Sequence, residues 1–153
     1  MSKSKKIPPV GPVEKKVPSS STRTGSIKTS DRVKFRFLGA SHFYDSPWSL
    51  KKLSESDSHL VLNKILEYET WTLHEVFVSS GFFKQENLAD SPAKGTSFNN
   101  LLIKIEETLG HSELISIRVS KIERLWACRE NEELFVLLWD PTHTLWPSKK
   151  KHT

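Results

Sequence analysis

The feature that most constrains the fold is a run of three strand-like segments between residues 113 and 140. ELISIRVS, ERLWACRE and ELFVLLWD follow one another with only short turns between them. In the first segment Leu114, Ser116 and Arg118 fall on one face and the apolar residues between them on the other, which is the two-residue period of a half-buried strand. The third segment is apolar on both faces, as in a central or well-covered strand. The pattern predicts a three-stranded antiparallel meander.

A first strand and a long helix are expected before the meander. DRVKFRFLG places Val33, Phe35 and Phe37 on one face and basic residues on the other, so we expect a half-buried strand with a basic outer face. Residues 46–71 follow a helical period of apolar positions. This helix is expected to be divided into two pieces around residues 54–58.

A second, shorter helix should follow. Thr72 and Glu75 fit a capping box, so this helix is expected to start at Leu73 and to run antiparallel to the first. Residues 84–97 are rich in turn formers and predict a loop, whereas residues 98–110 favour a helix or a mixed connection. The sum is an α+β protein with an N-terminal strand, an antiparallel helix pair and a C-terminal antiparallel β-meander, its helices on one side of an antiparallel sheet.

The positive charge of the chain is concentrated at its two ends. Residues 1–30 hold seven of the 23 Lys and Arg residues and one of the 18 Asp and Glu residues, and the last five residues hold three more lysines. Residues 31–148 therefore keep thirteen basic and seventeen acidic residues, a net charge of −4. We expect a disordered basic tail over residues 1–30, a single α+β domain over 31–147, and a basic C-terminal tail over 148–153.

Two tryptophans and the single cysteine of the meander are expected to serve packing. Trp126 and Trp139 flank a charged turn at nearly mirrored positions, which predicts a cross-strand aromatic pair. Cys128 lies in an apolar run and favours a small core residue over a nucleophile. With one cysteine there is no internal disulfide, as is typical of a reducing cytoplasm.

The sequence gives no sign of a membrane segment, a metal or a cofactor. No apolar run approaches the roughly 18 residues of a membrane span, so we expect a cytoplasmic protein. The histidines outside the C-terminal segment lack metal-ligand spacing with one another or with Cys128: His42, His59, His74 and His111.

The meander carries a family resemblance. ISIRVSKIERLWACRENEELFVLLWDPTHTL is similar to the ending of YoeB-type members of the bacterial RelE/YoeB/ParE toxin superfamily. In that ending a strand with an arginine leads into a strand of the form x-R-L-V-Y, and a third strand closes near a histidine. On this alignment Arg118 and Arg124 match the two arginines and His143 lies near the C-terminal histidine. The order of elements over residues 31–147 is also similar.

The resemblance implies a small bacterial toxin that cleaves RNA without a metal ion. Attack of a ribose 2′-OH on the adjacent phosphate needs a proton acceptor, a cation and an acid for the leaving oxygen. Arg124, His143 and Glu123 are the candidate catalytic residues, with Glu113 as a second candidate base. The residues expected to contact nucleic acid are Arg118, Lys121 and Trp146. The expected partners are an antitoxin-like protein and RNA or the ribosome, with no membrane.

Each of these residues also has a purely structural interpretation. Arg124 follows an acid and is as well suited to a surface ion pair as to phosphate, and Lys121 is typical of a solvated turn. Asp140 and Thr142 can form a local turn that explains His143 by geometry alone. Trp146 suits either base stacking or docking of a protein partner.

Three function hypotheses follow. The first is the RelE/YoeB-like toxin of a toxin–antitoxin pair. The second is a non-enzymatic accessory protein on the same scaffold, which binds a protein partner while its basic tails add attraction to nucleic acid. The acidic body and Ala127, which stands where the family has a tyrosine, favour this second hypothesis. The third is a ParE-like protein that poisons gyrase without cleaving RNA.

Overall fold

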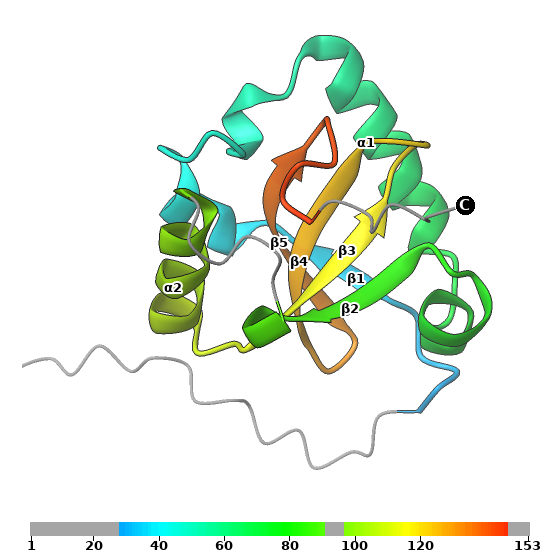
Figure 1. The fold of residues 1–153 in the computed structure, drawn as a ribbon. Coiled ribbons are helices and arrows are strands. Elements are labelled where there is room, and N and C mark those ends of the chain that lie inside the picture. Colours follow the sequence, from blue (N-terminus) through cyan, green and yellow to red (C-terminus); the bar gives the residue numbers. More distant parts are fainter. Residues whose placement is uncertain (1–27, 91–96, 147–153) are drawn as a thin grey trace, which may run out of the picture.

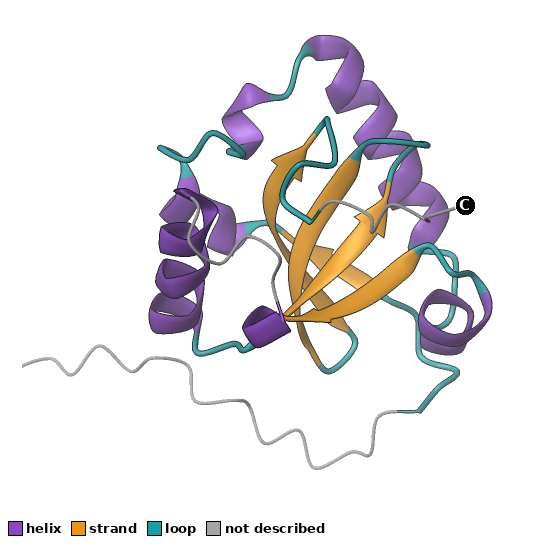
Figure 2. Ribbon diagram, in the orientation of Figure 1, coloured by secondary structure: helices purple, strands orange, loops and turns teal. Residues whose placement is uncertain are grey.

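The structure, a computed structural model, describes residues 28–90 and 97–146. It has the α+β class, with a single five-stranded sheet at the centre and helices around it (Figures 1 and 2). The predicted tails lie outside the described residues, apart from residues 28–30. The strands and longer helices are β1 (Lys34–Arg36), α1 (Glu55–Tyr68), β2 (Phe83–Asn87), α2 (Ser97–Leu109), β3 (Glu113–Arg118), β4 (Arg124–Glu130) and β5 (Glu133–Asp140).

Short helical turns connect these elements. They are the 3-10 turns Leu38–Phe43, Leu50–Lys52 and Leu88–Asp90, and the π-helical turn Glu75–Ser79. The division of the first helix is confirmed, because Ser54 caps α1 through a capping box with Asp57. The second capping box is also present: the backbone N–H of Thr72 donates to Glu75, and the backbone N–H of Glu75 donates to the Thr72 hydroxyl. Both helix starts are therefore encoded by local side chains.

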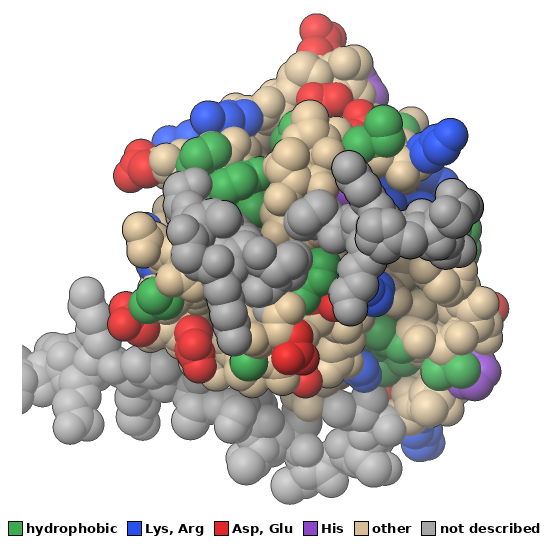
Figure 3. Space-filling model, viewed as in Figure 1, with side chains coloured by type: hydrophobic (Ala, Val, Ile, Leu, Met, Phe, Trp, Pro, Cys, Tyr) green, Lys and Arg blue, Asp and Glu red, His purple; other side chains and the backbone are tan. Residues whose placement is uncertain are grey.

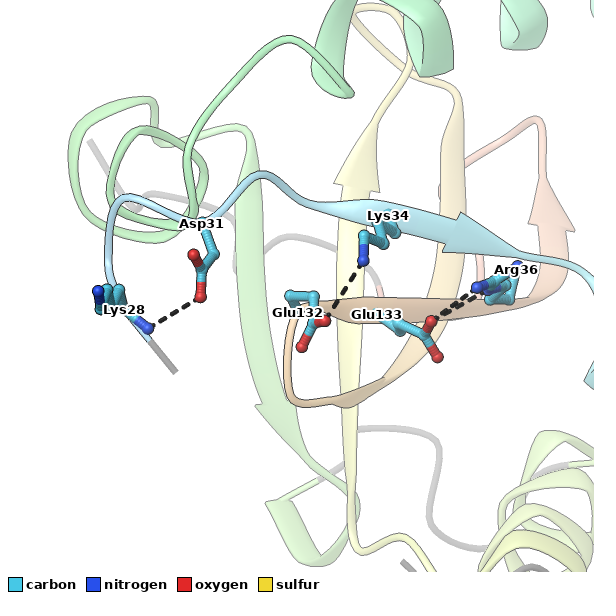
Figure 4. Close-up of polar contacts among 6 residues, drawn as sticks. All are labelled: Lys28, Asp31, Lys34, Arg36, Glu132 and Glu133. Carbon is cyan, nitrogen blue, oxygen red and sulfur yellow. Dashed lines mark hydrogen bonds and ion pairs between the residues drawn. The ribbon is translucent and has the colours of Figure 1, made fainter. Parts of the chain in front are cut away.

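The strand order of the sheet is β1-β5-β4-β3-β2. The predicted meander is confirmed, because β3, β4 and β5 pair antiparallel in sequence order. β1 pairs parallel with β5, so the sheet is mixed and not antiparallel throughout. Two acids at the start of β5 match the basic outer face of β1: Lys34 pairs with Glu132, just before β5, at 3.4 Å, and Arg36 pairs with Glu133, its first residue, at 2.8 Å (Figure 4).

Residues 84–97 were expected to form a loop, and this expectation is wrong for their first part. Residues 83–87 form β2, an edge strand that pairs antiparallel with β3. Four of its five side chains are polar, so the segment carries almost no apolar signal; Phe83 alone is buried among them. Residues 91–96 of the expected loop lie outside the described residues. Residues 98–110, expected to form a helix or a mixed connection, belong for the most part to the helix α2.

Both faces of the sheet are covered, which corrects the expectation of helices on one side. On the first face Val61, Ile65 and Tyr68 of α1 and Val76 of the π-helical turn pack against the sheet. On the opposite face α2 contributes Leu102 and Ile105, the segment before α1 contributes Phe43, and the C-terminal segment contributes Leu145. Figure 2 shows helices on either side of the strands. The sheet is thus the middle layer of three.

The predicted pairing of Trp126 with Trp139 is also wrong. Trp126 lies opposite Leu138, and Trp139 lies opposite Leu125, with a bulge between Trp126 and Ala127. The two indoles therefore belong to the packing clusters of opposite faces. The cause is a register shift of one residue, which reverses the face of every side chain beyond it.

Cys128 is a buried core residue, as expected. Burial raises the pKa of its thiol to about 12, so the thiol stays protonated at neutral pH.

Candidate functional site

A pocket of about 520 Å³ opens on the face of the sheet that carries α2. Ser116 and Trp126 of its floor share this face with the second core cluster, because side chains alternate along β3 and β4. Charged and aromatic side chains dominate its lining, which consists of Gly81, Phe82, Lys84, Glu86, Asp90, Ser116, Arg118, Arg124, Trp126, His143 and Trp146. A volume of this size is typical of a site for a small molecule or one nucleotide.

Two rows of side chains cross the floor of the pocket. In the first row Arg118 of β3 lies opposite Arg124 of β4, and Arg124 lies opposite Asp140 of β5. In the second row Lys84 lies opposite Ser116, which lies opposite Trp126. The register of the sheet, and not proximity in sequence, brings these residues together.

Arg124 is held from inside the protein. It is 7% exposed, and its guanidinium donates to the carbonyl oxygens of Ser120 at 2.9 Å, Glu123 at 2.9 Å and Lys121 at 3.3 Å. These carbonyls belong to the turn between β3 and β4, so Arg124 fixes that turn. The structure thus replaces the expected surface ion pair with bonds to the main chain.

Asp140 organises the segment after β5. It is fully buried, and its Oδ1 accepts from the backbone N–H and the hydroxyl of Thr144, while Oδ2 accepts from the backbone N–H of Leu145. The chain therefore folds back over the end of β5. His143 sits in this turn with a φ of +56°, a left-handed conformation.

The turn directs His143 toward the arginines. Its side chain is partly buried and lines the pocket. Burial lowers the pKa of His143, and Arg124, Arg118 and Lys84 lower it further, while Asp140 acts in the opposite direction. His143 is consequently neutral at pH 7 and able to accept a proton.

Trp146 closes one side of the pocket. Its ring centroid lies 6.1 Å from that of Trp126, with the planes tilted by 33°. Trp126 is fully buried, and its indole N–H has no acceptor within the described residues. An unpaired buried N–H is costly, so this group is one that a bound ligand can satisfy.

Four of the six residues predicted from the sequence meet in this pocket: Arg118, Arg124, His143 and Trp146. Lys121 and Glu123 do not line it. Lys121 is exposed in the β3–β4 turn, and its contribution to the site is the carbonyl that receives Arg124. Glu123 likewise offers its carbonyl to Arg124. Glu113, the second candidate base, lies at the far end of β3 opposite Asn87.

Sequence reasoning missed the contributions of Lys84 and Glu86, because β2 was not recognised as a strand, and that of Asp90 in the 3-10 turn after it. Lys84 and Glu86 are two positions apart on the strand, so they share a face, and their side chains pair at 2.6 Å. The one available signal was this i, i+2 spacing of opposite charges. Figure 3 shows acidic and basic side chains both distributed over the viewed surface.

The fold and pocket define an α+β protein with a site on its sheet that is lined by aromatic side chains and by charged side chains of both signs. No family model, curated protein or solved structure matches the chain. Among residues 28–90 and 97–146, no group of three or more His, Cys, Asp or Glu side chains is placed to hold a metal ion. Within the same residues, no helix has the length and apolar character needed to cross a membrane.

Proposed function

We propose that this pocket binds a phosphate group of single-stranded RNA and that the protein is a RelE/YoeB-like toxin that cleaves RNA without a metal ion. One observation carries the proposal: Arg118, Arg124 and His143 come from three different segments and line one pocket. Two guanidinium groups beside a neutral imidazole supply the charge and the proton acceptor that phosphodiester cleavage by a 2′-OH requires.

The reaction would proceed by internal attack. His143 takes the proton from the ribose 2′-OH as the oxygen bonds to the adjacent phosphorus. The bond from phosphorus to the 5′ oxygen of the next nucleotide breaks, and that oxygen takes a proton from water. The hydroxide that remains takes the proton from His143, which returns the imidazole to its neutral form. The products are a 2′,3′-cyclic phosphate and a 5′-hydroxyl end. Arg118 stabilises the negative charge that develops on the phosphate oxygens.

Arg124 has a positioning role in this scheme. Its guanidinium is engaged by three carbonyl oxygens, so it fixes the β3–β4 turn and adds positive charge beneath the phosphate. Arg118 is exposed and lies with its guanidinium 5.5 Å from the Phe82 ring, so it is the arginine more available to a ligand. Trp146 offers a ring on which a base can stack.

The experiment is induced expression in bacteria. Wild-type protein is expected to arrest growth, and Arg118→Gln and His143→Asn are expected to relieve the arrest while remaining folded. Asn is chosen at residue 143 because it tolerates the left-handed backbone found there. Lys52→Gln, an exposed basic position outside the pocket, is the matched control and should remain toxic. Harmless expression of the wild type at high level would rule out the toxin.

A toxin of this kind implies a cytoplasmic location and an antitoxin-like protein partner. A gene for a small antitoxin-like protein immediately beside the gene for this chain would support both. Co-expression of that partner should restore growth, and a partner that binds without restoring growth would contradict the proposal.

A second candidate function is binding of a protein partner without catalysis. The favouring observation is that Leu62 and Leu66, one turn apart on α1, are 54% and 56% exposed. A pull-down with and without residues 1–30 at two salt concentrations tests this alternative together with the predicted role of the tail. If the chain without residues 1–30 binds nucleic acid equally well at both salt concentrations, electrostatic attraction of nucleic acid by the basic tail is excluded.

A further inference from the structure

We propose that the pocket contains a subsite for guanine, so that the RNA is recognised at a guanosine. This inference rests on the proposed function and adds the identity of the base. Its central residue is Glu86, whose side chain is 13% exposed and lines the pocket beside Lys84. Glu86 and Asp90 are the two acids in a lining that also holds Lys84, Arg118 and Arg124. A carboxylate disfavours phosphate and suits a ligand group that donates hydrogen bonds.

The sheet places Glu86 away from the arginines. The backbone N–H of Arg118 donates to the carbonyl oxygen of Phe82, just before β2, whereas Glu86 lies opposite Leu114 further along. Lys84 stands between these two positions on the same face. The pocket therefore has a cationic end for phosphate and an acidic end for a base, and about 520 Å³ is enough for one nucleotide.

Guanine is the base that matches a carboxylate. Its N1–H and N2 amino group are adjacent donors on one edge, and a carboxylate accepts two such hydrogen bonds side by side. Adenine and cytosine each place a ring acceptor next to the amino group, and uracil flanks its single N–H with two carbonyl oxygens. The pairing of Glu86 with Lys84 occupies one of about four acceptor positions of the carboxylate.

The aromatic residues of the pocket fit the rest of the base. Phe82 and Trp146 line it and offer ring faces for stacking. The indole N–H of Trp126, unpaired within the described residues, matches the O6 and N7 acceptors of guanine. Since this N–H is buried, a neighbouring side chain has to move for a base to reach it.

The test is binding of short RNAs that differ at one base. The probes are fluorescent uridine hexamers that carry a single guanosine, adenosine, cytidine, uridine or inosine, all 2′-O-methylated so that the 2′-OH attack is blocked. Fluorescence anisotropy with the full chain gives each dissociation constant. The guanosine probe should bind about tenfold more tightly than the others, the effect of one pair of lost hydrogen bonds. Inosine, which lacks only the N2 amino group, should lose most of this preference.

The variants separate this inference from the proposed function. In Glu86→Gln the dissociation constants of the guanosine and uridine probes should become equal. Their ratio is the readout, because removal of a negative charge strengthens the binding of every probe. Glu107→Gln, an exposed position on α2 outside the pocket, should keep the ratio. Equal binding of all probes that is lost in Arg118→Gln would overturn the guanine subsite and leave the phosphate site intact. Absence of binding to any probe would overturn both.

Discussion

Arg118 and Arg124 lie directly opposite each other on the neighbouring antiparallel strands β3 and β4, and both line the same pocket. Like charges at such a pair of positions repel and destabilise a sheet. The pKa of Arg124 is lowered first by its burial and then by Arg118, while Asp140 raises it from the other side. An arrangement that costs stability without a ligand and is relieved by an anion is typical of a binding site.

Replacement of Arg118 should weaken phosphate binding and leave the stability of the fold almost unchanged. Because Arg118 is exposed and faces Arg124, Arg118→Gln should change the free energy of unfolding by less than about 0.5 kcal/mol or increase it slightly. Inorganic phosphate should raise the melting temperature of the wild type and leave that of the variant unchanged. Differential scanning fluorimetry over a series of phosphate concentrations measures both effects. If phosphate stabilised the wild type and the variant equally, Arg118 would not be part of the phosphate site.

Replacing Arg124 should destabilise the fold even if the charge is kept. Arg124→Lys loses the planar fork that reaches three carbonyl oxygens, so we expect a loss of about 2 kcal/mol in the free energy of unfolding. Urea denaturation gives the value, and Arg32→Lys, at an exposed position before β1, is the matched control. A change as small as that of the control would mean that Arg124 does not hold the turn.

Asp140→Asn should loosen the segment that carries His143 and Trp146. The amide cannot accept on both sides, so one of the bonds to Thr144 or Leu145 is lost, at a cost of about 1–3 kcal/mol. Exposure of Trp146 to water should shift the tryptophan emission to longer wavelength. Asp45→Asn, at an exposed position, is the control and should leave the stability and the emission wavelength unchanged. Unchanged stability and emission in Asp140→Asn would contradict the role of Asp140 in holding this segment.

His143 should titrate below the ordinary histidine pKa of 6.5. Its folded pKa is lowered by burial and by the nearby arginines. As the pH falls, the unfolded chain therefore takes up the proton first. The contribution to stability is complete above pH 6.5 and is lost as the pH drops through the folded pKa.

Nuclear magnetic resonance of the imidazole Cε1–H checks this titration. In Arg118→Gln the pKa of His143 should rise, because one of the charges that lower it is gone, and bound phosphate should raise it as well. A pKa above 6.5 in the wild type, unaffected by Arg118, would contradict the pocket geometry.

The parts of the fold that the sequence could predict are those set by short-range signals. The period of the meander identified three strands, and the side-chain caps Ser54 and Thr72 marked two helix starts. The polar edge strand β2 was missed because an edge strand with one buried side chain has no hydrophobic period to detect. Coverage of both faces also depended on α2, whose orientation no local pattern specifies.

For the site, alternation along β3 correctly placed Arg118 on the face of Leu114 and Ser116. The bulge at residue 126 could not be foreseen, and it is the reason that the tryptophan pair was predicted wrongly. Asp140 was expected to form a local turn, and it does so through Thr144 and Leu145. Lys84 and Glu86 of β2 line the pocket because β2 pairs with β3, a segment distant in the sequence. No local pattern in a single sequence specifies such a pairing.

The most direct measurement of the central claim is the product of RNA incubation. Purified full-length protein and single-stranded RNA, with and without ribosomes, are incubated in a chelating buffer, and the ends of the products are analysed. The account predicts 2′,3′-cyclic phosphate and 5′-hydroxyl ends with the wild type, and none with Arg118→Gln or His143→Asn that retain the wild-type melting profile. Intact RNA with the wild type under both conditions, or cleavage that persists in both variants, would contradict the claim.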